Sequence, residues 1–120
     1  MPSPFSTQSA QMLKGHLDLL LLAACQGGPL HGYALMERLR LGSDGQFDLP
    51  EGTIYPALHR LEQAGLLTSR WSDDGPRRRR LYELSARGRT ALEAGRQTWR
   101  SFESGMNTIL FGRVEGEMGS

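Results

Sequence analysis

The sequence predicts a mostly α-helical fold with a small β-hairpin, arranged as a winged helix-turn-helix that continues into one long C-terminal helix. Three observations lead to this prediction. Apolar residues recur at helical spacing in three successive segments before residue 65. Two extended runs joined by an Asp-Gly-Pro turn follow them, and a heptad-like apolar pattern fills the last third of the chain. A length of 120 residues suffices for one domain with a modest core.

Composition places the chain among ordinary globular proteins, with 38% hydrophobic and 22% charged residues. The formal net charge of +1 identifies no partner. The longest apolar run, Leu19 to Cys25, is far shorter than the roughly 20 residues of a membrane span, and the first residues lack the pattern of a signal peptide. We therefore expect a cytoplasmic protein without membrane contact. The single cysteine, Cys25, is expected to be a small buried hydrophobe rather than a redox group.

The first two helices are predicted by their apolar spacing. Residues 1–11 are rich in Ser, Pro and Gln without a hydrophobic period, so we expect a flexible N-terminal arm. From Leu13 the segment LKGHLDLLLLAACQ predicts a helix that is buried on more than one side. GGPL ends this helix, HGYALMERLRL begins a second one, and GSDGQ ends that in turn.

The third helix is predicted between Gly52 and Gly65, and it has one narrow buried stripe. Pro56 is tolerated near the first turn of a helix, so the helix is expected to begin close to Gly52 or Thr53. The buried stripe consists of Ile54, Ala57, Leu58, Leu61 and Ala64. The other side, which either contacts a partner or stays hydrated, carries Thr53, Tyr55, Pro56, His59, Arg60 and Gln63.

The β-hairpin is predicted from the runs LLTSRW and RRLYELS, which alternate apolar and polar residues around the turn SDDGP. It carries a local excess of positive charge. Its five arginines are Arg70 and the four at 77–80, and its two acidic residues are Asp73 and Asp74, so the balance is five minus two, or +3. A helix of this size fits the major groove of DNA, and a basic hairpin beside it can contact phosphates. Arginine runs also occur on hydrated surfaces, so charge alone leaves nucleic-acid binding open.

Longer motifs resemble the PadR family of transcriptional regulators. They are LHGYAL at 30–35, EGTIYPALHRLEQAGLL at 51–67 and GPRRRRLYELSARG at 75–88, followed by a long helix. The resemblance covers about Leu13 to Phe111. Leu81 replaces a common aromatic and Ser85 a common threonine; Leu81 still supplies apolar bulk, and Ser85 can still cap the next helix.

The resemblance implies which residues contact DNA. For Tyr33 we favour a packing or backbone-contact role over base contact, and Tyr55 packs either on a phosphate or on the second helix. Gly32 and Gly52 are expected to serve close helix packing and a helix start. The complete set of expected DNA-binding residues is Tyr33, Thr53, Tyr55, Pro56, His59 and Arg60, with Arg77, Arg78, Arg79 and Arg80 on the DNA backbone.

The last helix, 86–111, is predicted to form a homodimer, because its apolar positions follow a heptad spacing that one projecting helix cannot bury alone. The resemblance agrees, since PadR proteins pair through this helix, and one C-terminal helix matches the short, LmrR-like subfamily. A two-fold dimer is expected to bind an inverted-repeat operator. The expected interface comprises Leu17, Leu20, Leu21, Leu92, Trp99, Phe102, Met106 and Ile109.

Trp99 has two alternative roles. In LmrR-like proteins a tryptophan at the matching place lines a cavity between subunits and stacks on flat aromatic, multidrug-type ligands; otherwise Trp99 packs the dimer core. Asp18 is the other residue expected at such an effector site. Release of the operator by an effector would require the ligand to favour one spacing of the two wings. Repression itself is implied only by the habit of the family.

An enzyme is not expected, and neither is a metal or cofactor. His16, His31 and His59 lie on different predicted elements without metal-ligand spacing, there is no cysteine pair, and no phosphate-binding glycine loop follows a strand. The alternative function is a winged-helix protein-interaction module without DNA binding. The four arginines and the polar face of the third helix favour nucleic acid over that alternative.

These expectations divide the chain into four parts. Residues 1–11 form a flexible N-terminal arm and residues 12–85 a winged helix-turn-helix DNA-binding domain. Residues 86–111 form the C-terminal dimerisation helix, and residues 112–120 a flexible tail.

Overall fold

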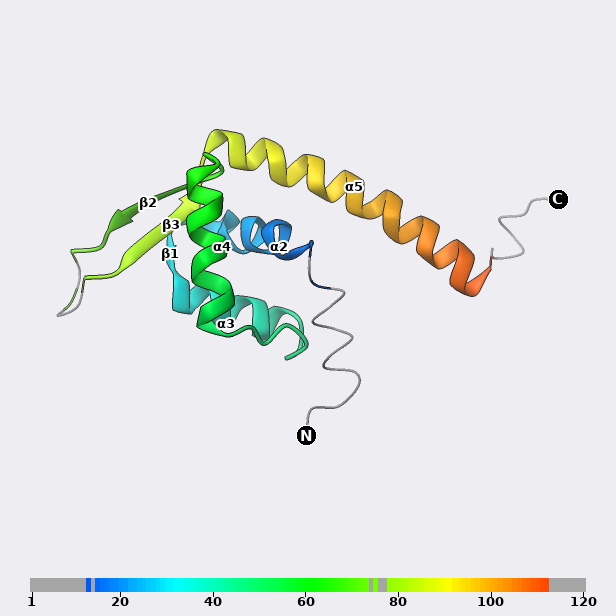
Figure 1. Cartoon of the computed structure of the whole chain (residues 1–120), viewed down its shortest axis with the longest axis horizontal. Coiled ribbons are helices and arrows are strands. Elements are labelled where there is room, and N and C mark those ends of the chain that lie inside the picture. The colour runs from blue at the N-terminus through cyan, green and yellow to red at the C-terminus, as the bar shows by residue number, and fades with distance from the viewer. Residues whose placement is uncertain (1–12, 14, 74, 76–77, 113–120) are drawn as a thin grey trace.

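The computed structural model describes residues 13, 15–73, 75 and 78–112, and it confirms the predicted fold class of helices with a small antiparallel sheet. Three helices pack into a body from which the hairpin projects at one end, while the last helix leaves at the other (Figure 1). In order the elements are α2 (Leu17–Ala24), η1 (Cys25–Gly27), β1 (Leu30–His31), α3 (Gly32–Gly42), α4 (Glu51–Gln63), β2 (Leu67–Trp71), β3 (Arg80–Leu84) and α5 (Ala86–Phe111).

The first helix differs from the sequence prediction at its start. A helix was expected from Leu13, but Gly15 has a φ of +95° and the continuous helix α2 begins at Leu17. Such a left-handed backbone is incompatible with a right-handed helix and is available to glycine without strain. The preceding turn still contributes to the core, since Leu13 is buried.

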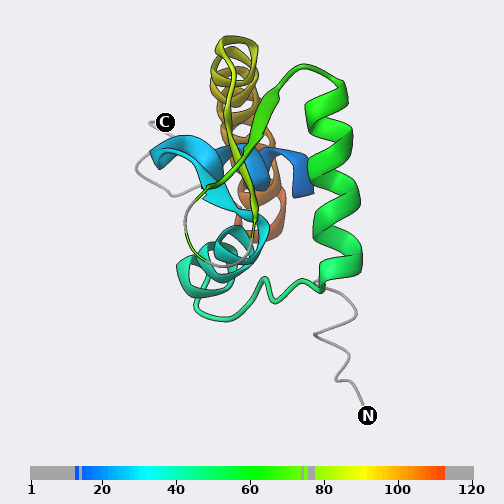
Figure 2. The ribbon, with the colours of Figure 1, turned by 90° about the vertical axis from the view of Figure 1, so that its left-hand side faces the viewer.

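The sheet has three strands in the order β1-β3-β2. The predicted hairpin is confirmed, with β2 and β3 antiparallel from the pair Leu67 and Leu84 to the pair Trp71 and Arg80. Strand β1 was not predicted because it has only two residues, too few for an alternating pattern. It joins the far edge of β3, where Leu30 pairs with Tyr82, and it brings the start of α3 beside the wing (Figure 2).

Helix α4 buries the stripe that its apolar spacing predicts, except at its end. Ala64 is exposed rather than buried, because it is the C-cap residue beyond the last helical turn. Gly65 then ends the helix as predicted, with a φ of +80° and the amide of Leu66 donating to the carbonyl of Leu61 over 3.0 Å. The four helical members of the stripe, all buried, are Ile54, Ala57, Leu58 and Leu61.

The start of α4 lies slightly earlier than expected. The helix begins at Glu51, after Pro50 in an extended conformation, so Pro56 lies inside the helix and beyond its first turn. Proline has no N–H, and the carbonyl of Gly52 therefore lacks its usual helical partner. Gly52 is exposed, so water can hydrogen-bond to this carbonyl.

Helix α5 is fixed to the domain at its N-terminal end. Ser85 caps it as predicted: the amide of Gly88 donates to Ser85 Oγ over 2.9 Å, and this hydroxyl donates to the carbonyl of Gly65 over 2.6 Å. Gly88 lies against the carbonyl of Leu66, and Gly95 against the side chain of Leu19 on α2. The rest of the 26-residue helix extends past the three-helix body (Figure 1).

Candidate nucleic-acid interface

The exposed face of α4 has a central stripe that includes the polar side chains of His59 and Gln63. Gly52, Pro56, His59 and Gln63 follow one another at i, i+4, i+7 and i+11 and are all exposed, on the side away from the buried stripe. Pro56 and His59 were among the expected DNA contacts. Gln63 was left on the same side but not chosen, although its spacing of seven from Pro56 places it on this stripe. In this stripe the side chains of His59 and Gln63 can present hydrogen-bonding groups to base edges in a major groove.

Tyr55 lies at the edge of this face that adjoins α3. A Cβ atom placed on Gly32 would be 2.5 Å from Cε1 of Tyr55, so the ring packs directly on the first residue of α3. The ring thus packs on the second helix, which is one of its two predicted roles, and Gly32 is a site of close packing. Contact of Tyr55 with a phosphate stays a prediction. The Tyr55 side chain remains 41% exposed on the rim of the face.

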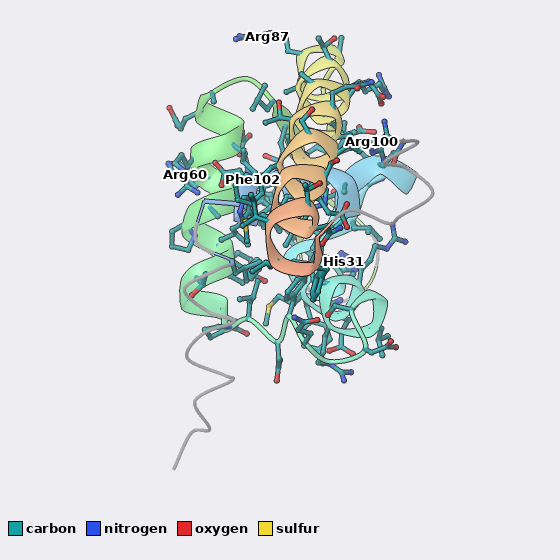
Figure 3. The ribbon with its side chains drawn as sticks, turned by 90° about the vertical axis from the view of Figure 1, so that its right-hand side faces the viewer. His31, Arg60, Arg87, Arg100 and Phe102 are labelled. Atoms are coloured by element: carbon teal, nitrogen blue, oxygen red, sulfur yellow. The ribbon has the colours of Figure 1, made fainter. Side chains whose placement is uncertain are left out.

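Arg60 lies at the opposite edge with Thr53, facing α2. Its Nη2 is 2.5 Å from Oδ1 of Asp18, and both side chains are about half exposed, at 58% and 47%. Arg60 extends outward from α4 (Figure 3). Asp18 was expected beside Trp99, but it borders a different hollow together with Asp48, Thr53 and Arg60. The charge of Arg60 is thus paired with an acidic side chain in the protein without DNA.

The wing arginines differ in their surroundings. The guanidinium carbons of Arg78 and Arg80 lie 5.0 and 5.1 Å from the ring centre of Trp71. Arg80 Nε also donates to Ser69 Oγ over 2.8 Å, and its Nη2 lies 3.6 Å from a carboxylate oxygen of Glu62 on α4. Arg77 lies outside the described residues. Sequence patterns gave no signal for Trp71, because its contacts depend on the register of the hairpin.

A hollow of about 640 Å³ separates the wing from the helices. Cationic side chains line it from the wing and phenolic side chains from α3 and α4, and Tyr33 beside it is 61% exposed. Positive charge therefore faces the Tyr55 edge of α4, an arrangement that suits a helix in the major groove with a neighbouring DNA backbone. The lining residues are His31, Gly32, Tyr33, Tyr55, Trp71, Arg78, Arg79, Arg80 and Tyr82.

The residues expected at a dimer interface fall into three groups: buried, partly buried and exposed. Leu21 and Leu92 are 0% and 2% exposed within the single chain, where they belong to the core of the domain. They offer no surface to a partner, so their assignment to the interface is wrong: periodicity cannot show which chain covers a buried side chain. Leu17 and Leu20 are partly buried against the same core. The large apolar side chains exposed on α5 are Trp99, Phe102, Met106, Ile109, Leu110 and Phe111.

A second hollow, of about 600 Å³, opens where α5 passes α2. The His16 ring meets Trp99 edge-on at a centroid distance of 5.2 Å, and the rings of Trp99 and Phe102 are 5.8 Å apart. The lining of this hollow is mainly apolar and aromatic, as in sites for small apolar ligands. The residues are Leu13, His16, Leu19, Leu20, Gln46, Phe47, Trp99, Phe102 and Met106.

Metal-ligating and reactive side chains form no further site in the described ranges. There, no cluster of three or more His, Cys, Asp or Glu side chains could hold a metal ion. No described helix is long and apolar enough to cross a membrane. The thiol of Cys25 is buried, and this desolvation raises its pKa to about 12 despite the nearby positive charge of Arg38. Such a thiol is unreactive at neutral pH.

The helix order, the exposed α4 and the basic wing define a winged helix-turn-helix protein of the DNA-binding class. Residues 20–94 match the model of the transcriptional regulator PadR-like family, and the chain belongs to this family. Family membership supports regulation of transcription through DNA binding, as the sequence motifs predicted. The narrower assignment to LmrR-like proteins rests on the sequence resemblance and stays a prediction.

Individual relatives agree with this assignment. The transcriptional regulator Rv3488 of Mycobacterium tuberculosis is 37% identical over 84 residues, which cover 70% of this chain and 73% of that protein. A PadR family regulator from Eggerthella lenta is similar in structure, with a TM-score of 0.77, 29% identity and coverage of 90% and 93% of the two chains. A PadR-like regulator from Bacillus cereus gives a TM-score of 0.75 with 29% identity, covering 86% and 99%.

Proposed function

We propose that this protein is a cytoplasmic, homodimeric repressor that binds an inverted-repeat operator through α4 and the wing. One observation carries the proposal: Arg78, Arg79 and Arg80 line a hollow that also includes Tyr55, a residue at the edge of the exposed face of α4. Base contacts from the stripe would supply sequence preference, and arginine contacts to phosphates would supply much of the affinity. A protein-interaction module would instead be expected to expose apolar residues on this face.

The homodimer is supported by the exposed apolar surface of α5. Trp99 and Met106 are each 40% exposed in the single chain, Phe102 is 52% exposed and Ile109 83%. Fully burying one such side chain contributes about 1.5–3 kcal/mol, so a second copy of the helix would gain much by covering them. Closed two-fold pairing is the commonest arrangement of identical chains, and it would place two α4 helices on two half-sites.

The oligomer can be tested by adding a charge to this surface. In Ile109→Glu we expect a dimer to dissociate, because a carboxylate would have to be buried against the partner helix. The matched control is Asn107→Glu, which adds the same charge at an exposed position off the apolar seam. Sedimentation velocity measures the masses. A wild-type monomer, or equal dissociation of the two variants, would contradict the proposed interface.

Release by a flat aromatic effector is the finer part of the proposal. It is supported by the aromatic hollow at Trp99, into which α2 and α5 both contribute side chains. In a dimer α5 would also contact the partner subunit. A ligand in the hollow at Trp99 could therefore favour one spacing of the two wings. Couplings of this type are typically about 1–3 kcal/mol, or about 5- to 150-fold in operator affinity.

The function is tested by a mobility shift with the promoter region beside the gene of this protein. We expect a retarded band that a scrambled duplex does not compete away, and His59→Ala or Gln63→Ala should change the preference among operator variants. Absence of any shift with wild-type protein would remove the DNA-binding proposal and leave the interaction module. Transcription from that promoter, measured with and without the protein, distinguishes repression from activation.

The effector is tested separately through fluorescence. The chain has two tryptophans, so Trp71→Phe leaves Trp99 as the sole indole. Planar aromatic compounds should quench this emission in Trp71→Phe and leave a Trp99→Phe variant unquenched, and the same compounds should release the operator from wild-type protein. Operator binding without any quenching would refute the effector while leaving the regulator intact.

A further inference from the structure

We propose that Trp71 is a positioning residue that holds the Arg78 guanidinium ready for a backbone phosphate of DNA. The inference rests on the proposed contact between the wing and DNA. It concerns a residue outside the arginine run, at the last position of β2. Trp71 would act on DNA binding through Arg78 and not through a contact of its own.

The geometry of the ring is the first support. The guanidinium carbons of Arg78 and Arg80 both lie over the Trp71 ring, at 5.0 and 5.1 Å from its centre. Cations within about 6 Å of an indole centre are attracted by the negative face of the ring, and tryptophan is the most effective residue for this contact. The cross-strand pairing of Trp71 with Arg80 fixes where the ring stands on the wing.

The two arginines have different partners beyond the ring. Arg80 is tied to α4 through Ser69 Oγ, at 2.8 Å, and through Glu62, whose carboxylate also accepts from Ser69 Oγ over 2.5 Å. Its charge is thus partly compensated, and it fixes the wing to α4. In the described part of the chain, no acidic side chain pairs with Arg78. Unlike Arg80, Arg78 thus has no acidic partner on α4 in this part of the chain.

The position of Arg78 explains why an ordered side chain would matter. It lies towards the tip of the wing, exposed to solvent, and lines the hollow next to α4. An arginine without support at this place samples many rotamers, and fixing them on binding costs affinity. The Trp71 ring restricts Arg78 in the unbound protein, so less of this cost remains when a phosphate binds. Trp71 itself is 48% exposed, so the stack is accessible.

The test is a double-mutant cycle between Trp71→Leu and Arg78→Ala, measured by fluorescence anisotropy on a labelled duplex of the promoter region. Leucine removes the ring face but keeps an apolar side chain. We expect Trp71→Leu alone to weaken binding about two- to fivefold for each engaged wing, the equivalent of one exposed cation–π contact. In the Arg78→Ala background the same change should have little further effect.

Arg79→Ala is the matched control. Arg79 neighbours Arg78 and lines the same hollow, but its guanidinium does not lie over Trp71. Trp71→Leu should therefore weaken binding as much in the Arg79→Ala background as in the wild type. Trp71→Phe, which restores a ring face, should recover at least part of the affinity. Thermal unfolding of each variant shows whether the wing still folds.

The outcomes distinguish failure of the proposed role of Trp71 from failure of the proposed contact between the wing and DNA. Equal losses from Trp71→Leu with and without Arg78 would overturn the inference and mean that Trp71 contacts DNA itself or only supports the fold. No loss from Trp71→Leu would overturn it as well. If Arg78→Ala and Arg79→Ala both keep wild-type affinity and salt dependence, the wing contact fails first and the inference with it.

Discussion

Replacing Asp18 by asparagine is predicted to increase affinity for DNA, although the residue lies on α2 and not on α4. Asp18 is 2.5 Å from Arg60, one of the residues expected to face DNA. We expect Arg60 to leave this carboxylate when it contacts DNA. The negative charge of Asp18 at the edge of the α4 face also repels phosphates. An asparagine at this position would remove both effects while keeping the size of the side chain.

The magnitude follows from the exposure of the pair. Both side chains are about half exposed, at 58% and 47%, so the pair belongs with surface ion pairs in spite of its short distance. Such pairs are worth about 0.2–1 kcal/mol. Recovering that free energy on binding corresponds to about 1.4- to fivefold tighter binding per protomer, or about two- to 25-fold for a dimer. The free energy of unfolding should fall by the same small amount.

Fluorescence anisotropy with a labelled promoter duplex at low salt measures the affinity, and urea unfolding measures stability. Glu93→Gln is the matched control, because it breaks an exposed ion pair with Arg96 on α5, away from α4. It should leave DNA affinity unchanged. Equal or weaker binding by Asp18→Asn would refute the reasoning and indicate that Asp18 holds Arg60 in its DNA-binding position. A gain that persists in the Arg60→Ala background would also refute the role of the pair.

Three further predictions concern glycines and the cysteine. Gly32→Ala should displace the Tyr55 ring, because the new Cβ would lie 2.5 Å from Cε1 of Tyr55. Only the end of that side chain has to move, so we expect urea unfolding to show a stability change within about 1 kcal/mol. Fluorescence anisotropy should show clearly weaker DNA binding. Gly88→Ala should instead cost about 1–3 kcal/mol or more in urea unfolding, because its Cβ would meet the backbone carbonyl of Leu66. Cys25 should resist a thiol reagent in the native state and react on unfolding. Since its pKa is raised from 9.0 to about 12, the stability that it contributes should be complete below pH 9 and be lost as the pH rises towards 12, which pH-dependent unfolding would show.

Features that depend on neighbouring residues could be predicted from the sequence. Ser85 caps α5 because its hydroxyl accepts a hydrogen bond from an unpaired amide in the first turn. Gly65 ends α4 because it adopts a left-handed backbone conformation. Both effects involve only nearby residues. The exposed side of α4 followed from apolar spacing alone. The break in the helix at Gly15 was not predicted, because the apolar spacing around a glycine does not indicate whether its φ is positive.

Features that depend on the tertiary fold could not be predicted. Asp18 and Arg60 are 42 positions apart, and their contact requires α2 to cross α4. Trp71 meets Arg78 and Arg80 only through the hairpin register. Apolar spacing likewise marked Leu21 as buried without showing that its own chain covers it.

The central claim, that α4 and the wing bind DNA together, is tested most directly by the salt dependence of promoter binding. Affinities of the wild type and of an Arg78→Ala, Arg79→Ala double variant are measured over a series of salt concentrations. The claim predicts a steep linear fall of log affinity with log salt, and a slope that is shallower in the variant by about 0.9 for each phosphate that it no longer neutralises. An identical slope for the two proteins, or wild-type protein that does not bind the promoter, would contradict it.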